Sequence, residues 1–489
     1  MDEFKNKNII VIGAGPAGLT AGFEISKTKR FNVNILEKDK VVGGLSKTTV
    51  YNGCKFDIGP HHFLTHSDKV EVWWKKVMEG ESKKGNKFIH LKRFTRIYYK
   101  RHFFHYPLQA LDAILGLGLL EGFLCVLSYI KIRLFPIKKV ESFQDWVTNQ
   151  FGYRLFSIFF KTYTEKVWGI NCNQISSDWA SERIKGFSLS KAIFYAFFGK
   201  FFKKNAPRTL ADTFYYPELG AGTLWSKTAD IILENNNSQI TLNEKVIQIK
   251  HEDKNIKSIL TYNTSLGVHA LKKFNEHICD FVFSTMPLRD LILALDPLPE
   301  EIVISAANKL SYRGLITVNL IVNKKNICPD HWLYIHEKTV EMGRVGNMNN
   351  FSLKMSDNKN HTALSLEYFS FVDSDFWNKS DTELLELGKI ELEKIGLVNK
   401  NLILNGMILR EHEAYPVYDK NYKENLNIVK NYLLKFNNLY LMGRNGLHQY
   451  NNMDIAMLSA FDATEKFLGN FDRENIYLAG HKKNIELNL

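Results

Sequence analysis

The sequence predicts an α/β fold organised around a Rossmann-type dinucleotide-binding domain, with an inserted helical region and a separate antiparallel sheet. Three observations lead to this prediction. A strand, a glycine-rich turn and a helix open the chain, and a second strand ending in an acid follows. Much later, after a long helical and aromatic-rich stretch, short buried strands return.

The first strand covers residues 9–12, where Ile-Ile-Val-Ile forms the continuous apolar run of a buried parallel strand. It leads into Gly13-Ala14-Gly15-Pro16-Ala17-Gly18 and a helix over residues 19–27. In this pattern the first glycine permits the tight turn, the second lets the backbone approach a pyrophosphate, and the third allows close packing of helix and strand. The helix N-terminus then offers N–H groups and a positive dipole end to phosphate.

The second strand, residues 33–36, ends in Glu37, which we expect to accept hydrogen bonds from ribose hydroxyls. Strand, glycines, helix, strand and acid in this order are a stronger signal than the glycines alone, which also occur in tight turns that bind no ligand. A second glycine pair follows in Val41-Val42-Gly43-Gly44-Leu45-Ser46. It lets the backbone pass close to a bound dinucleotide a second time.

The remaining elements follow from apolar periodicity. We expect strands at 92–99 and 102–106, helices over 141–169, returning strands at 240–242, 246–249 and 281–283 that join the nucleotide-binding sheet, substrate-side strands at 315–322 and 363–369, a helix at 381–395, a last strand at 439–443 and a last helix at 454–467. The dinucleotide-binding domain then comprises residues 1–90, 226–300 and 431–489, with an inserted helical and sheet region at 91–225 that faces substrate or membrane, and a substrate-binding sheet at 301–430.

Length and composition indicate a globular protein of more than one domain. The 489 residues are too many for one ordinary core, and 45% hydrophobic with 24% charged residues excludes a disordered chain. The net charge of +12 favours acidic partners, namely a nucleotide diphosphate, an anionic membrane surface or nucleic acid. Because no nucleic-acid-binding module is present, we expect no nucleic acid partner.

Cysteine usage and the N-terminus indicate a cytoplasmic location. The cysteines are far apart and odd in number, which argues against a disulfide framework and a metal site: Cys54, Cys125, Cys172, Cys279 and Cys328. The chain begins with polar and charged residues and enters a strand directly, so we expect no signal peptide.

Residues 110–130 form the most hydrophobic stretch, interrupted by Asp112 and Glu121 and followed by basic residues at 131, 133, 138 and 139. Spanning a bilayer needs about 20 apolar residues without interruption, so we expect no spanning helix. A buried helix pair is expected, and a peripheral contact with the inner face of a membrane is left open. The phenylalanine- and lysine-rich residues 192–204 fit either a second part of that surface or an aromatic core helix.

The segment at residues 162–169, Thr-Tyr-Thr-Glu-Lys-Val-Trp-Gly, places Tyr163 and Trp168 five residues apart, and aromatic rings stack well on planar bases. It resembles the YTEKxWG segment of bacterial UDP-galactopyranose mutases. Further matches follow the same order along the chain, at residues 59–65, 105–108, 343–345, 414–419 and 443–453. The glycine-rich N-terminal segments resemble the FAD-binding half of the superfamily containing these mutases, amine oxidases and protoporphyrinogen oxidases. The resemblance implies FAD and a flavoprotein fold with two dinucleotide-binding parts.

The resemblance also implies roles for individual residues. FAD would be bound by Gly13, Gly15, Pro16, Ala17, Gly18, Glu37, Lys38, Gly43, Gly44, Leu45, His61, Gly443, Arg444, Asn452 and Met453. His61 would lie near the isoalloxazine, and with Arg344 and Arg444 it makes up the catalytic set. The two arginines would grip the substrate diphosphate beside the flavin, for which a guanidinium fork is well suited.

For the substrate, Tyr163 would stack on uracil, Trp168 would line the sugar pocket, and Tyr415 and Tyr450 would donate hydrogen bonds to the diphosphate. The family's RIPVRF segment corresponds to residues 183–187 and keeps Arg183, but Phe187 replaces its second arginine, so that contact is missing or comes from Lys185. Simpler roles are also open: a surface ion pair for Arg344, packing for Tyr415 and a core position for His61.

The resemblance implies an enzyme that isomerises a nucleotide-linked hexose between pyranose and furanose forms through reduced flavin, for cell-surface polysaccharide synthesis. One alternative is an FAD-dependent oxidoreductase of the amine oxidase or protoporphyrinogen oxidase type. Against it, the segment around Gly443 lacks the glycine-rich sequence usual in such oxidases. A catalytically idle flavoprotein that assembles partners is the other alternative. The sugar, the nucleotide, the electron donor and the oligomeric state stay open.

Overall fold

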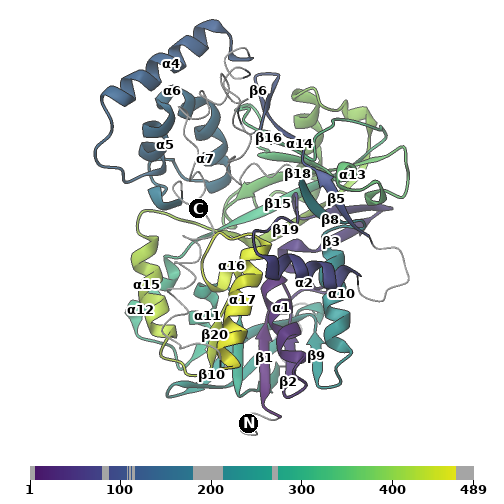
Figure 1. Cartoon of the computed structure of the whole chain (residues 1–489), viewed down its shortest axis with the longest axis vertical. Coiled ribbons are helices and arrows are strands. Elements are labelled where there is room, and N and C mark those ends of the chain that lie inside the picture. The colour runs from purple at the N-terminus through teal and green to yellow at the C-terminus, as the bar shows by residue number, and fades with distance from the viewer. Residues whose placement is uncertain are drawn as a thin grey trace.

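The computed structural model describes residues 6–79, 87–106, 108, 112, 116–179, 213–266 and 274–469. Two large sheets dominate the arrangement (Figure 1). A parallel sheet lies towards the N-terminal end in the lower half of the view, and a larger sheet with a group of helices forms the upper half.

The lower sheet is fully parallel and draws its strands from the whole chain. Its order is β20-β13-β1-β2-β9, with β1 at Asn8–Ile12, β2 at Asn32–Leu36, β9 at Ser238–Thr241, β13 at Phe281–Ser284 and β20 at Leu439–Leu441. The first and last strands among the described residues therefore belong to one sheet, as the sequence predicts. The α/β fold with a Rossmann-type domain is confirmed.

Both faces of this sheet are covered. Successive side chains of β1 point to opposite faces, so Ile9 and Val11 enter one core while Ile10 and Ile12 enter another. The first core is closed by α1 (Pro16–Ser26), α2 (Asp68–Glu79), α10 (Gly222–Leu233) and α17 (Met453–Phe467). On the other face lie α11 (Leu288–Leu293), α12 (Glu301–Asn308) and α15 (Tyr422–Leu433). Burial on both faces explains why β1 is apolar at every central position.

One predicted strand does not join the parallel sheet. Residues 246–249 belong to a separate four-stranded sheet of order β12-β11-β10-β14. Its strands are β10 (Glu244–Glu252), β11 (Asn255–Asn263), β12 (Phe274–Ile278) and β14 (Leu295–Asp296). The prediction for this segment was wrong because β10 turns back directly into β11 as an antiparallel hairpin, which a parallel sheet does not accommodate.

The upper sheet has seven strands in the order β19-β15-β18-β17-β16-β6-β7. These are β6 (Thr95–Tyr99), β7 (His102–His105), β15 (Tyr312–Val322), β16 (Trp332–Ile335), β17 (Arg344–Asn347), β18 (Thr362–Ser370) and β19 (Ile403–Pro416). All neighbours are antiparallel except β6 and β16. The helix α14 (Asp381–Lys394) packs on this sheet. The second, antiparallel sheet predicted from the sequence is therefore present.

Smaller elements complete the fold. Two further antiparallel pairs are β3 (Thr48–Tyr51) with β4 (Cys54–Asp57), and β5 (Phe88–Lys92) with β8 (Thr213–Pro217). Short helical segments are η1 (Gly44–Ser46), α13 (Met348–Phe351), η6 (Leu353–Met355), η7 (Lys400–Leu402) and α16 (Gly443–Gly446). The inserted helices are α4 (Leu119–Leu134), α5 (Phe143–Phe151), α6 (Tyr153–Leu155), a π-helical turn at Phe156–Lys161 and α7 (Thr162–Trp168).

The expectation that the hydrophobic stretch is buried was wrong for α4. This helix covers residues 119–134, and only Gly122 and Cys125 in it are buried. The helix contacts the molecule along one narrow side, so its other apolar side chains face outward. Within the described part of the chain, no helix has the length and apolar character needed to cross a membrane. Residues 192–204 lie outside the described residues.

Candidate active site

A large cavity of 2130 Å³ lies between the parallel sheet and the seven-stranded sheet. Residues within two positions of the carboxyl ends of β1, β2, β13 and β20 line one end of it: Gly13, Glu37, Thr285 and Gly443. The carboxyl ends of parallel strands are the usual ligand site of such sheets. The other end is lined by residues of the seven-stranded sheet and α7, among them Tyr163, Arg344 and Tyr415.

Two glycine-rich segments form the first end of the cavity by lying against each other. The N–H of Gly43 donates to the carbonyl of Ala14 over 2.8 Å, and a Cβ added to Gly44 would lie 3.0 Å from the Cα of Gly15. Gly13 has φ +97°, and a Cβ there would lie 2.1 Å from Thr285 Oγ1. Bare backbone therefore makes this wall, with Pro16, Ala17 and Leu45 beside it, and it fits a ligand whose phosphates approach main-chain N–H groups.

Gly18 and Gly43 shape this end without lining the cavity. A Cβ on Gly18 would lie 1.8 Å from the carbonyl oxygen of Gly13, so the glycine lets α1 pack closely on β1, as predicted. Gly43 has φ +110°, a left-handed conformation that favours glycine, and allows the turn that brings Gly44 to Gly15. Both glycines, expected in the FAD-binding set, thus lie outside the cavity lining and support the backbone next to it.

Glu37 is buried at the end of β2, where its carboxylate accepts hydrogen bonds from the N–H groups of Ala14 (2.6 Å) and Asp39 (2.9 Å). Burial raises the pKa of Glu37, and these two N–H groups oppose the shift. A carboxylate has about four acceptor sites, so sites remain for ribose hydroxyls. The neighbouring Lys38 also lines the cavity, with its Nζ 3.5 Å from a carboxylate oxygen of Glu413.

The C-terminal part of the chain supplies a third wall. Gly443 has φ +79°, and a Cβ there would lie 3.1 Å from the Cβ of Ala17. Asn452 is the N-cap residue of α17, and both it and Met453 line the cavity. The N-terminus of a 15-residue helix therefore lies at the cavity, with the positive end of its dipole.

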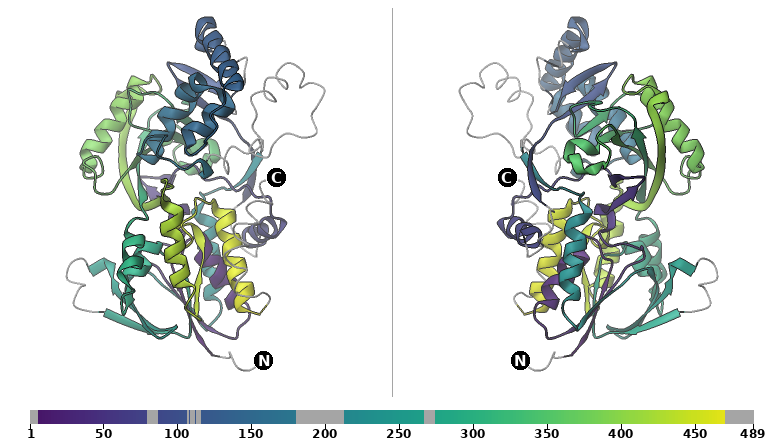
Figure 2. Two further views of the ribbon diagram at one scale, coloured as in Figure 1. Left: turned by 90° about the vertical axis from the view of Figure 1, so that its left-hand side faces the viewer. Right: turned by 90° about the vertical axis from the view of Figure 1, so that its right-hand side faces the viewer.

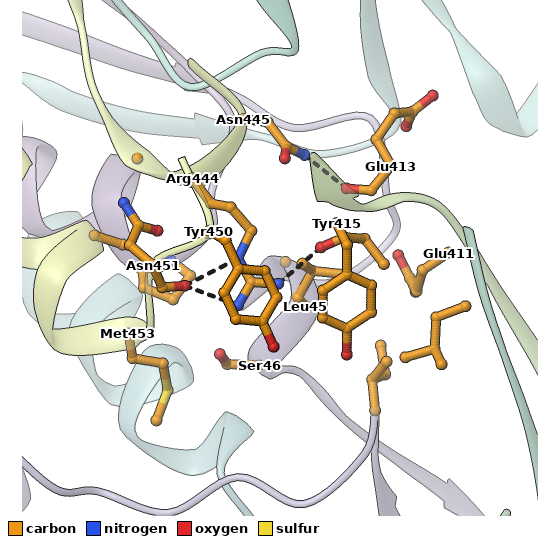
Figure 3. Close-up of a pocket in the computed structure, with 18 of the residues that line it drawn as sticks. Leu45, Ser46, Glu411, Glu413, Tyr415, Arg444, Asn445, Tyr450, Asn451 and Met453 are labelled. Atoms are coloured by element: carbon orange, nitrogen blue, oxygen red, sulfur yellow. Dashed lines mark hydrogen bonds between the residues drawn. The ribbon is translucent and has the colours of Figure 1, made fainter. Parts of the chain in front are cut away.

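Arg444 is held between two tyrosines by local hydrogen bonds (Figure 3). Its Nε and Nη2 donate to the carbonyl of Asn451 (3.0 and 2.8 Å), and its Nη1 donates to the carbonyl of Ala414 (2.7 Å). The guanidinium carbon lies 5.3 Å from the ring centroids of both Tyr415 and Tyr450. Arg444 thus fixes the loops that form the cavity wall and holds a positive charge in place there.

Arg344 forms a buried ion pair that sequence reasoning did not foresee. It lies opposite Glu367 on the adjacent strand, and its Nη2 donates to that carboxylate and to the hydroxyl of Tyr415 (3.1 Å). Glu367 is 0% exposed. Burial opposes the charge of Arg344, but the carboxylate outweighs it, so the pKa of Arg344 is raised. The alternatives of a surface ion pair for Arg344 and simple packing for Tyr415 are therefore wrong.

The histidine turn packs directly on this pair. Gly59 has φ +74°, and a Cβ on it would lie 2.9 Å from a carboxylate oxygen of Glu367. His61 follows in the cavity wall, with its Nδ1 3.1 Å from the carbonyl oxygen of Gly59. Burial, with contributions from Arg444 and Arg344, lowers the pKa of His61 to about 3. His61 is therefore neutral near pH 7.

Within the aromatic segment 162–169, Tyr163 lies in α7 and lines the cavity, where a residue predicted to contact substrate is expected. Its ring lies parallel to that of His336, with centroids 5.0 Å apart and an interplanar angle of 7°. Tyr334 contacts it edge to face at 5.4 Å. These contacts fix the plane of the tyrosine ring in the wall.

Three other residues of that segment, Lys166, Trp168 and Gly169, hold the structure around the cavity. Lys166 donates to the carbonyls of Glu337 (2.7 Å) and Met342 (3.0 Å), and Gly169 leaves room for the guanidinium of Arg313. Trp168 is 1% exposed and packs behind Tyr450, with ring centroids 5.6 Å apart. The prediction that Trp168 lines the sugar pocket was wrong, because five residues along a helix turn a side chain to a different face from that of Tyr163.

Several site residues were missed or cannot be placed. Arg183, Lys185 and Phe187 lie outside the described residues. Glu367 and His336 were not predicted. The signal for Glu367 was a lone acid within the apolar run of β18, where every residue is buried. His336 directly follows β16 and gave no comparable signal.

Comparisons with known proteins agree with this architecture. Residues 11–77 match a family model described as an NAD(P)-binding Rossmann-like domain. A 4,4'-diapophytoene desaturase (4,4'-diapolycopene-forming) of Methylomonas sp is 35% identical over 93 residues, 19% of this chain and 18% of the desaturase. The chain thus aligns with less than a fifth of that relative's length.

Two solved structures align over nearly the whole chain. Reduced UDP-galactopyranose mutase has a TM-score of 0.79 at 20% identity, covering 98% of this chain and 97% of the mutase. A putative protoporphyrinogen oxidase from Exiguobacterium sp. 255-15 has a TM-score of 0.68 at 16% identity, covering 97% and 100%. The chain therefore has the same overall fold as these two proteins. By name, both these proteins and the desaturase are enzymes, in line with the enzyme class predicted from the sequence.

Proposed function

We propose that the chain is an FAD-dependent enzyme whose cofactor occupies the glycine-lined end of the cavity. The paired backbone segments at Gly15 and Gly44, the acid Glu37 and the N-terminus of α17 suit the pyrophosphate, the ribose and the flavin edge of such a molecule. The volume of 2130 Å³ exceeds the roughly 300–1,000 Å³ of common small-ligand pockets, which leaves space for a second ligand.

We propose further that the second ligand is a nucleotide-linked hexose, which the enzyme isomerises between pyranose and furanose forms. The observation that carries this proposal is the buried Nε of Arg344, which has no hydrogen-bond partner among the described residues although it belongs to a charged group in the cavity wall. A buried donor without a partner is unfavourable, and a phosphate oxygen would satisfy it. When bound, a reduced flavin supplies the nucleophile for such an isomerisation.

The chain's own residues would bind and orient the substrate. Arg344, with Glu367 behind it, would direct its remaining N–H groups to the diphosphate, and the hydroxyl of Tyr415 lies within hydrogen-bond distance of the same guanidinium. Tyr163, held in plane by His336, offers a stacking surface for the base. His61 is neutral, so it can accept or donate a hydrogen bond without adding a charge beside the two arginines.

A role in cell-surface polysaccharide synthesis is part of this proposal, since furanose sugars linked to nucleotides are precursors for such polymers. The structural similarity to UDP-galactopyranose mutase supports the proposal. The test is to incubate the FAD-loaded, dithionite-reduced protein with UDP-galactopyranose and other UDP-hexoses and to separate the products. A furanose isomer is the expected result. If no UDP-hexose is isomerised by the reduced enzyme, the proposal is wrong.

The second candidate is an FAD-dependent oxidoreductase. Two observations favour it: the charge of Arg344 is already compensated by Glu367, and the chain is similar to a desaturase over its N-terminal part and to a putative protoporphyrinogen oxidase in fold. Steady oxygen consumption with an amine, a porphyrinogen or a polyene substrate, without sugar isomerisation, would establish this alternative.

A further inference from the structure

The helix α4 presents a continuous apolar stripe to the outside of the molecule. Leu119 and Leu120 are 78% and 75% exposed, and the turn after the helix carries Phe135 at 73%. Other exposed apolar side chains follow at helical spacing on the same side: Phe123, Val126, Leu127, Ile130 and Leu134. Large apolar side chains exposed together in this way mark an interaction surface.

The opposite side of α4 attaches it firmly to the molecule. Glu121 forms an ion pair with Arg154, whose Nε lies 2.5 Å from Oε1 of the carboxylate. Gly122 and Cys125 on the same side are buried. A Cβ on Gly152 would lie 2.8 Å from the backbone nitrogen of Tyr129, so the two segments approach closely. Figures 1 and 2 show α4 along the outer edge, at the end of the molecule opposite the N-terminus. The helix is therefore fixed with its apolar stripe directed away from the body.

Positive charge lies at one end of this stripe. Lys131, Arg133 and Lys138 are exposed, and Lys139 pairs with Glu141. The acid within α4, Glu121, is turned towards Arg154 and away from the stripe. The stripe and its basic end thus combine apolar side chains with net positive charge, in a chain of net charge +12. This combination is typical of helices that lie in the interface of an anionic bilayer.

We propose that α4 and the turn after it bind the surface of an anionic lipid bilayer. With 16 residues the helix is about 24 Å long, and it would lie flat with its apolar side chains among the lipid headgroups. Anionic headgroups complement the basic end, whereas a second copy of this chain would bring a second set of like charges to the contact. This inference does not depend on the proposed reaction.

Flotation of the FAD-loaded protein with vesicles tests the proposal. We expect binding to phosphatidylcholine vesicles that contain phosphatidylglycerol and much weaker binding to pure phosphatidylcholine. The triple variant L120E/F123E/L127E should lower the partition coefficient about tenfold or more, because its charges face the apolar interface. As a matched control, L298E/I302E/L353E places three charges at exposed apolar positions outside α4 and should keep most of the wild-type binding.

A second variant separates charge from apolar contact. K131E/R133E/K138E should lower binding to the anionic vesicles about a hundredfold and abolish its salt dependence. Retention of the flavin and an unchanged circular dichroism spectrum check that each variant is folded. The proposal is overturned if the wild type does not float with anionic vesicles, or if the α4 variants float equally well. It is also overturned if α4 is found to mediate self-association, with sedimentation showing a dimer that L120E/F123E/L127E dissociates and no lipid binding.

Discussion

The two ends of the cavity are built in different ways. At the glycine-lined end the wall is backbone, and its geometry depends on residues that have no side chain, such as Gly15 and Gly44. At the other end the wall consists of side chains from separate elements, among them Arg344, which is paired with the buried Glu367. The structure of the glycine-lined end depends on the absence of side-chain atoms. The structure of the other end depends on the pairing of buried charges.

This difference sets how each end responds to substitution. A backbone wall tolerates an added Cβ only where the facing segment leaves room for it. A buried ion pair responds to charge instead, because one partner left alone is costly whereas the two together are accommodated. Substitutions can therefore test each end separately.

The largest effect is expected for Glu367→Ala. The change leaves the guanidinium of Arg344 buried without its carboxylate, which should lower the free energy of unfolding by about 3–5 kcal/mol. Urea unfolding at pH 7 measures it. Glu367→Gln keeps a hydrogen-bond acceptor of the same shape and should lose less, and Glu386→Ala, which removes a surface partner of Lys389, should change little. Equal losses for Glu367→Ala and Glu386→Ala would show that the buried pair carries no special weight.

The next largest effect is expected for Gly18→Ala, whose Cβ would lie 1.8 Å from the carbonyl oxygen of Gly13. Such overpacking should lower the free energy of unfolding by about 3 kcal/mol. Gly15→Ala is the matched control, because its φ of −78° suits alanine and its Cβ would meet Gly44 at an ordinary 3.7 Å.

Gly15→Ala should fold normally and yet bind FAD about tenfold more weakly, because the new methyl group would occupy the path of the pyrophosphate. Urea unfolding and FAD titration of the apoprotein distinguish the two variants. Normal FAD affinity in Gly15→Ala would contradict the assignment of this wall to the dinucleotide.

A smaller effect is expected on the pH dependence of stability, through His336 at the end of the cavity that is lined by side chains. Burial lowers the pKa of His336 to about 3, below its ordinary value of 6.5. The unfolded chain therefore takes up a proton between these values that the folded protein does not. The contribution of His336 to the free energy of unfolding is fully present above pH 6.5 and is lost as the pH falls towards 3. Between pH 7 and pH 5 the loss amounts to about 2 kcal/mol.

His336→Phe keeps a ring against Tyr163 but cannot take up a proton, so its unfolding free energy should fall less than that of the wild type over the same range. Urea unfolding at the two pH values gives the comparison, since the other buried histidines contribute equally to both proteins. An identical decrease in the two proteins would show that His336 is not buried in its neutral form.

The sequence predicted the two ends of the cavity to different degrees for the same physical reason. The glycine end is local, so Gly13, Gly15 and Glu37 could be assigned from spacing alone. At the side-chain end, Glu367 becomes a partner of Arg344 only through the pairing of β17 with β18, which no local pattern records. Trp168 was misplaced because a shared motif does not reveal which of its residues face the cavity. For the stretch that contains α4 the sequence left burial and surface contact both open, because an apolar run has the same appearance in either case.

The central claim is that one cavity holds a flavin dinucleotide against bare backbone and a diphosphate against Arg344. The most direct measurement is a titration of the FAD-loaded protein with UDP, followed by flavin absorbance, in the wild type and in R344M/E367Q. The double variant removes both charges together, so the fold and the yellow cofactor should be retained. We expect UDP affinity to fall about a hundredfold. The reason is that the variant loses hydrogen bonds from a charged group, each of which contributes about 1.5–3 kcal/mol. Unchanged UDP affinity in the variant, or no UDP binding by the wild type, would contradict the account.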